Sequence, residues 1–184
     1  MELINTGFQD LILIKPSVFE DSRGYFCESY NKTAYKKAGI NCNFVQDNQS
    51  SSIKGVIRGL HYQLMPYAQS KLIRALCGTI FDVAVDLRTG SPTYGKWYGV
   101  ELSSENMLQL FIPQGFAHGF SVLSEKAVVL YKTDDFYKKE AERGIRFDDP
   151  LLKIDWKLDP TEIIVSEKDH QLPTLDEAEA NFIL

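Results

Sequence analysis

The stretch Thr79-Ile-Phe-Asp-Val-Ala-Val-Asp-Leu87 decides the fold class of this chain. Its apolar side chains recur with period two, so Phe81, Val83 and Val85 share one face of a predicted strand while the two aspartates lie on the other. Sustained alternation of this kind indicates a β-strand rather than a helix.

Similar short apolar runs flank this stretch in both directions. Eight more are predicted as strands, at Leu11–Ile14, Phe44–Gln46, Gly55–His61, Leu72–Cys77, Trp97–Leu102, Gln109–Ile112, Ala117–Val122 and Ala127–Thr133. Asn31 is placed to cap a helix over Asn31–Ala38, Ser103–Met107 is predicted as one more turn, and the acidic tail Leu175–Asn181 as a final helix. Many short strands with few helices predict a mainly β protein: a β-sandwich, jelly roll or barrel.

Length and composition narrow the class of protein. We expect the 184 residues to form a single domain, residues 1–184, because this length suffices for one substantial core. A net charge of −5 and a pI near 5.2 argue against a nucleic-acid surface. Three cysteines without Cys-x-x-Cys spacing favour buried thiols in a reducing compartment. No signal peptide and no membrane span are visible, so we predict a cytoplasmic protein with no membrane partner.

Polar side chains are crowded into residues 44–63, which otherwise read as buried strand. They include Gln46, Asn48, Arg58 and His61. A strand can aim such alternate side chains into one cavity. Alone, His61 would be interpreted as a hydrogen-bonded strand histidine. Cations that point into a partly buried space are costly unless an anion pairs with them, so the neighbouring Arg58 favours a proton-transfer site that also holds an anionic ligand.

His118 lies in the stretch Ile112-Pro-Gln-Gly-Phe-Ala-His-Gly-Phe120, whose Pro-x-Gly-x-x-His spacing matches the second half of the cupin signature. In metal-binding cupins this histidine is a ligand, and the first half supplies His-x-His followed by Glu. Here only His61 occupies that pattern, with Gln63 in the second place. Two histidines fall short of a metal site with three or four ligands. We therefore predict a cavity without metal.

The roles of the other candidate residues depend on whether the fold brings them to the same cavity. Tyr131 at the end of an apolar strand is a core-edge tyrosine or a proton donor, and Asp169 is a loop charge unless it orients His61. Lys71 joins the site if it shares the cavity with Arg58. Arg23 lies in a glycine-containing loop with two aromatic residues, which is either a solvated turn or a cover over a ligand.

Taken together, these segments closely resemble the dTDP-4-dehydrorhamnose 3,5-epimerase family of nucleotide-sugar enzymes. The matching motifs are Asp21-Ser-Arg-Gly-Tyr-Phe26, Phe44-Val-Gln-Asp-Asn48, Arg58-Gly-Leu-His-Tyr-Gln63, Asp82-Val-Ala-Val-Asp86, Ser91-Pro-Thr-Tyr-Gly95, Ile112–Phe120, Leu123-Ser-Glu125, Tyr131-Lys132 and Ser166-Glu-Lys-Asp169. They occur in the family's order over almost the whole chain, and that order is more specific than any single motif. The sequence Tyr137-Lys-Lys139 departs from the family, because many relatives have a proline there.

The resemblance implies a cupin-type jelly-roll β-barrel (a double-stranded β-helix) with a few short helices. It also implies a homodimer whose N-terminal strands and lid loops help complete the neighbouring site. By motif, His61 would be the general base, Asp169 its orienting partner, Tyr131 the opposing acid and Lys71 the contact to the sugar carbonyl. The residues that would hold the nucleotide, diphosphate or sugar are Arg23, Phe26, Glu28, Gln46, Asn48, Arg58, His118, Glu142 and Lys168.

The implied reaction explains the residue types. The hydrogens at C3 and C5 of a dTDP-4-keto-6-deoxyhexose are acidic because both carbons adjoin the ketone, and a histidine, with an ordinary pKa of about 6.5, suits their removal near neutral pH. The ketone itself activates these positions, so we expect neither cofactor nor metal. The alternatives are an epimerase at C3 or C5 alone, a keto-sugar isomerase, a metal-dependent cupin and a catalytically silent sugar-binding module.

Overall fold

Two sheets and a separate hairpin make up the fold of the computed structural model, which describes all 184 residues. The six-stranded sheet runs in the order β1 (Glu2–Asn5), β2 (Ile12–Lys15), β10 (Gln109–Ile112), β7 (Lys71–Cys77), β12 (Lys126–Thr133) and β5 (Gln46–Ile53). The five-stranded sheet runs in the order β13 (Glu142–Gly144), β6 (Ile57–Gln63), β11 (Phe116–Val122), β8 (Thr79–Asp86) and β9 (Trp97–Ser103). The hairpin pairs β3 (Val18–Asp21) with β4 (Gly24–Cys27).

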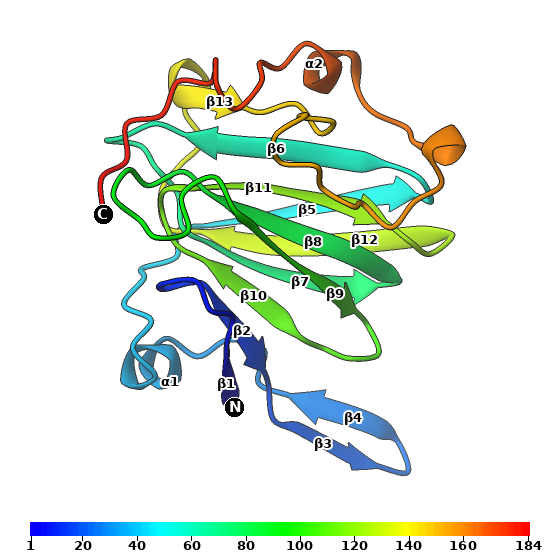
Figure 1. Cartoon of the computed structure of the whole chain (residues 1–184). Helices are drawn as coiled ribbons and strands as arrows, with labels where there is room; N and C mark the ends of the chain where they lie inside the picture. The colour runs from blue at the N-terminus through cyan, green and yellow to red at the C-terminus, as the bar shows by residue number, and fades with distance from the viewer.

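The two large sheets face each other as the halves of a cupin-type jelly roll (Figure 1). Helices are short: α1 (Lys32–Lys37) and α2 (Glu167–His170), with 3₁₀ turns η1 (Lys139–Ala141) and η2 (Pro160–Glu162). The hairpin projects from the lower end of the molecule, whereas α2 and β13 lie at the opposite end (Figure 1). None of these helices is long and apolar enough to cross a membrane.

Strand β8 confirms the alternation predicted for residues 79–87, and it is buried on both faces. Phe81, Val83 and Val85 pack in one core cluster, against Leu152 and Trp156 of the C-terminal segment. Ile80 and Ala84 pack in a second cluster, with residues of the six-stranded sheet. Asp82 lies between Ile80 and Ala84 on the same face of the strand. The strand therefore places a fully buried carboxylate between the two sheets.

The pairing of β6 with β11 brings the two cavity histidines together. His118 is the register partner of His61, and a β-bulge follows directly after His118. Gly59 and Gly119 permit this close approach: a Cβ on Gly59 would lie 2.5 Å from the Cα of Gly119. Gly59 also has a φ of +118°, a conformation that glycine adopts readily.

Most of the other strands, the helix and the turn predicted from the sequence are present in the structure. The other strand predictions correspond to β2, β6, β7, β9, β10, β11 and β12, and α1 forms with Asn31 as its N-cap. Residues 103–107 form a hydrogen-bonded turn, from the Met107 amide to the Ser103 carbonyl.

Two predictions were wrong. The strand predicted at 44–46 begins instead at Gln46 and continues to Ile53, because this polar run pairs with β12 at the edge of the sheet. The helix predicted over Leu175–Asn181 does not form: those residues make an irregular segment in which Leu175 packs on the core.

Sequence reasoning also missed several elements. The segment around Arg23, predicted as a loop, is the β3–β4 hairpin. Strands β1 and β13 and helix α2 were not anticipated either, because each has at most four residues and carries little periodicity.

Candidate active site

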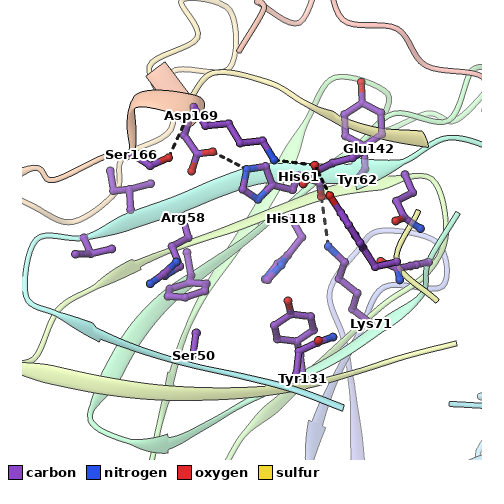
Figure 2. Close-up of a pocket in the computed structure, with 18 of the residues that line it drawn as sticks. Ser50, Arg58, His61, Tyr62, Lys71, His118, Tyr131, Glu142, Ser166 and Asp169 are labelled. Atoms are coloured by element: carbon purple, nitrogen blue, oxygen red, sulfur yellow. Dashed lines mark hydrogen bonds and ion pairs between the residues drawn. The ribbon is translucent and has the colours of Figure 1, made fainter. Parts of the chain in front are cut away.

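One cavity of about 620 Å³ opens between the two sheets near β13 and α2 (Figure 2). Strands β5, β12 and β7 form one wall, strands β6 and β11 form the other, and residues 164–169 close one side. The cavity gathers ten of the residues predicted from sequence: Gln46, Asn48, Arg58, His61, Lys71, His118, Tyr131, Glu142, Lys168 and Asp169. They come from seven elements distributed over most of the chain.

Three predicted residues lie outside this cavity, on or next to the β3–β4 hairpin. The Arg23 guanidinium pairs with the Asp21 carboxylate at 2.6 Å and is largely exposed. The Phe26 side chain is 68% exposed. Glu28 accepts a hydrogen bond from the Asn31 side-chain amide at 3.0 Å. Within one chain, therefore, none of the three lines the cavity.

His61 and Asp169 form a hydrogen-bonded pair in the cavity wall (Figure 2). The His61 Nε2 lies 2.7 Å from the Asp169 Oδ1, and the Gly59 amide donates to the Asp169 Oδ2 at 3.3 Å. Burial raises the pKa of Asp169, but the hydrogen bond from His61 and its charge outweigh this and hold the pKa below its usual value. Because Nε2 is engaged, Nδ1 is the His61 nitrogen left for a ligand.

Helix α2 positions this carboxylate. Ser166 caps the helix and accepts a hydrogen bond from the Asp169 amide at 3.1 Å. The cap fixes a single turn in which Asp169 faces inward and is buried, while its neighbours Lys168 and His170 are exposed. This short capped turn thus brings Asp169 into contact with His61, although the two residues are 108 positions apart in the sequence.

Tyr131 extends into the cavity from β12, on the wall opposite His61 (Figure 2). Burial raises the pKa of its phenol, and the nearby charge of Arg58 offsets only part of that rise. The hydroxyl therefore keeps its proton at neutral pH. A protonated phenol therefore faces a histidine across the cavity.

Lys71 is the buried cation of the site. Its side chain comes from β7, and its Nζ donates to the backbone carbonyl of His61 at 3.4 Å. Burial lowers the pKa of Lys71 to about 8, although the charges of Asp82 and Glu142 oppose this shift. Lys71 remains a cation at neutral pH, close to its titration range.

Charged residues also line the mouth of the cavity. The Glu142 carboxylate accepts hydrogen bonds from the Lys168 Nζ at 2.7 Å and from the Tyr137 hydroxyl at 2.9 Å. On the other side, the Arg58 Nε donates to the Ser52 hydroxyl at 2.9 Å. Arg58, Lys71 and Lys168 together place three cations around the cavity.

Sequence reasoning missed some residues of the site. Tyr137 and Ser50 line the cavity, and Asp82 lies directly behind it, bonded to His118. For Asp82 a signal was present, since an aspartate on the inner face of an apolar strand needs a partner. No group of three or more His, Cys, Asp or Glu side chains is placed to hold a metal ion.

Comparison with known proteins gives one consistent result. The dTDP-4-dehydrorhamnose 3,5-epimerase family profile matches residues 5–177. The enzyme of that name from Pseudomonas aeruginosa is 56% identical over 172 residues, which cover 93% of this chain and 94% of the relative.

Solved structures agree. A dTDP-4-dehydrorhamnose 3,5-epimerase from Elizabethkingia anophelis superposes with a TM-score of 0.92 at 52% identity, covering 96% of this chain and 97% of the other. A dTDP-6-deoxy-D-glucose-3,5-epimerase from Legionella pneumophila, in complex with dTDP-4-keto-L-rhamnose, gives a TM-score of 0.92 at 48% identity, covering 96% and 93%. The chain belongs to the dTDP-4-dehydrorhamnose 3,5-epimerase family, whose members are isomerases.

Proposed function

We propose that this protein converts dTDP-4-keto-6-deoxy-D-glucose into dTDP-4-keto-L-rhamnose by inverting C3 and C5. The observation that carries the proposal is a base and an acid on opposite walls of one cavity. His61, bonded to Asp169, faces Tyr131 across a space that also contains the Lys71 cation. Binding alone would not need a proton acceptor and a proton donor on opposite sides of a ligand.

His61 is the general base in this proposal. The Asp169 carboxylate holds the proton of the ring on Nε2, so that the lone pair of Nδ1 points to the cavity. That nitrogen removes the hydrogen at C3 or C5, which is acidic because the neighbouring C4 is a ketone. Asp169 then stabilises the imidazolium that results.

Tyr131 completes each inversion, and between the two inversions exchange with solvent removes the proton from His61 and returns one to Tyr131. Once the proton has left, the reacting carbon is planar, and a proton delivered from the opposite side inverts its configuration. Tyr131 stands on that side and retains its proton at neutral pH. Lys71 lies beside His61 and stabilises the negative charge that develops on the C4 oxygen.

Charge complementarity supports a nucleotide-sugar substrate. Arg58 and Lys168 carry cations at the cavity mouth, where a diphosphate can be held by charge-assisted hydrogen bonds. Gln46, Asn48, His118 and Glu142 offer uncharged and acidic groups suited to sugar hydroxyls and the base.

The hairpin residues are proposed to act in a homodimer. Phe19, Tyr25 and Phe26 expose their aromatic side chains on the β3–β4 hairpin, around a shallow depression that also contains Arg23. Such an exposed apolar surface is typical of an interaction site. A second copy of this chain would cover it, and Arg23, Phe26 and Glu28 would then reach the cavity of that copy. All three cysteines are free, which supports a reducing cytoplasm, but they are not the buried thiols predicted: Cys77 is exposed, and Cys27 and Cys42 are half-buried.

The test is the identity of the product. The purified protein is incubated with dTDP-4-keto-6-deoxy-D-glucose, and the sugar is followed by proton NMR. We expect dTDP-4-keto-L-rhamnose, with both centres inverted. A product inverted only at C3 or only at C5 would replace the proposal with a single-site epimerase, and a ketone moved to another carbon would indicate an isomerase.

A further inference from the structure

The proposed reaction assigns no role to the buried carboxylate of Asp82. Asp82 lies on β8, on the inner face that it shares with Ile80 and Ala84, and its side chain is fully buried. Its Oδ1 lies 2.8 Å from the Nε2 of His118, but its Oδ2 has no hydrogen-bond partner. A buried carboxylate oxygen without a partner is costly, so a purely structural role would leave that cost uncompensated.

The Asp82–His118 pair repeats the geometry of the Asp169–His61 pair. In both pairs a carboxylate engages Nε2, at 2.8 Å and 2.7 Å respectively. The two histidines are register partners on neighbouring strands, and both line the cavity. Neither Nδ1 makes a hydrogen bond within the protein, so both are left for a ligand.

We propose that Asp82 is a positioning residue: it holds His118 as the neutral Nε2–H tautomer, whose Nδ1 accepts a hydrogen bond from a sugar hydroxyl, and it provides the counter-charge of Lys71. This inference rests on the proposed function, because it assigns His118 to the keto sugar. His118 is then a hydrogen-bond acceptor in the same cavity in which His61 is the base. Asp82 acts only through His118 and Lys71, since the substrate cannot reach it.

Electrostatics supports both parts of the inference. Burial lowers the pKa of His118, the charges of Lys71 and His61 lower it further, and Asp82 opposes these effects. The ring is therefore neutral at pH 7, and a neutral ring bonded to a carboxylate through Nε2 must carry its proton there. The charges that act on Lys71 are those of Asp82 on β8 and Glu142 on β13, its own charge acts on His118 on β11, and its Nζ donates to the His61 carbonyl on β6.

The first test reads the tautomer of His118 by ¹⁵N NMR of the whole wild-type protein. We expect one protonated nitrogen, Nε2, and one unprotonated nitrogen, Nδ1, at pH 7. Protonation of Nδ1, or of both nitrogens, would overturn the inference. This measurement requires no substrate and no variant, so its outcome is independent of the proposed function and of whether a substituted protein folds.

The second test is the variant Asp82→Asn, which preserves shape and removes the charge. We expect kcat/KM to fall about 10–100-fold, the range found when the carboxylate partner of a metal-bound histidine is removed. The pH above which kcat declines should also move down by about one unit, because Lys71 loses its counter-charge. If Asp82 had only a structural role, its replacement would not change the pH above which kcat declines.

A double-mutant cycle separates the contributions. His118→Asn removes the ring, so in that background Asp82→Asn should have a smaller effect on KM than in the wild type. If the wild type is active but Asp82→Asn leaves both the alkaline limb and the His118 tautomer unchanged, the inference is wrong while the epimerase function remains. If the wild type is inactive on every keto sugar, the proposed function fails instead.

Discussion

Hydrogen bonds, more than residue identity, determine which atoms of this site can react. His61 and His118 are the same residue type on paired strands, and each is engaged through Nε2 by an aspartate. Their surroundings differ: the His61 side chain is 32% exposed, whereas that of His118 is 8% exposed. Solvent can hydrate the positive charge of a protonated ring more readily at the more exposed site. This difference favours His61 over His118 as the base.

Lys71 predicts the alkaline limb of the pH profile. Its pKa is lowered to about 8 by burial, so it is a cation below that pH and loses its charge above it. If the cation stabilises the enolate, kcat should fall by about tenfold per pH unit above pH 8. The measurement is kcat against pH, with Lys71→Arg as the matched control. Arginine stays charged, so an alkaline limb unchanged in that variant would assign it to another group.

Tyr131→Phe separates proton removal from inversion. The variant keeps the ring and removes only the hydroxyl, so His61 can still form the enolate. In D₂O we expect deuterium to enter the substrate while inversion slows about 10²–10⁴-fold. Mass spectrometry and proton NMR of the recovered sugar measure both. Normal inversion by this variant would remove Tyr131 from the role of acid.

At the scale of elements, the contact between β6 and β11 fixes the distance between the two histidines. The glycines at 59 and 119 allow it, because a Cβ on Gly59 would meet the His118 carbonyl oxygen at 2.7 Å. This contact is between backbones, so it cannot be relieved by rotating a side chain. The pairing of His61 with His118 therefore depends on the absence of a side chain at Gly59.

Gly59→Ala should accordingly be severe. We expect a loss of about 2–5 kcal/mol in the free energy of unfolding, from overpacking together with an unfavourable backbone conformation. Gly90→Ala is the matched control, since Gly90 also has a positive φ, of +91°, but nothing lies within 4 Å of its Cβ position. The control should lose only about 1–2 kcal/mol. Equal losses in urea denaturation would show that backbone strain, and not the strand contact, is responsible.

The elements also show where sequence reasoning succeeds and where it stops. Strand β8 was predictable because Phe81, Val83 and Val85 recur at every second position of its sequence. Strand β5 was not, because its run Gln-Asp-Asn-Gln-Ser-Ser-Ser is polar and its strand character comes from pairing with β12 along its whole length. Helix α2 is a single turn, and only the folded chain shows that its Asp169 meets His61. Residue types and order thus indicated the chemistry, whereas the contacts that give each residue its role are tertiary.

At the scale of the whole molecule, β13 and α2, which contribute residues to the cavity, lie at the opposite end of the chain from the β3–β4 hairpin (Figure 1). A chain that uses its own hairpin would need a large rearrangement. In the proposed two-fold dimer none is needed if each hairpin reaches the cavity of the other chain. The proposed homodimer therefore makes the two active sites shared.

Subunit complementation tests this sharing. His61→Ala and Arg23→Ala proteins, each weakly active alone, are unfolded together and refolded as a mixture. If the hairpin acts in the partner's cavity, each hybrid dimer has one intact site, and about a quarter of the wild-type activity should return. If each hairpin serves its own chain, both sites of the hybrid are defective and no activity returns. Light scattering of the wild type should give the mass of a dimer, and a monomer would exclude this arrangement.

Solvent-deuterium uptake tests whether His61 removes the protons at C3 and C5. Wild-type protein and His61→Ala are each incubated in D₂O with dTDP-4-keto-6-deoxy-D-glucose, and deuterium at the two carbons is read by NMR. The wild type should incorporate deuterium at both positions, and His61→Ala at neither above the uncatalysed rate. Full uptake by the folded variant would show that a group other than His61 removes these protons.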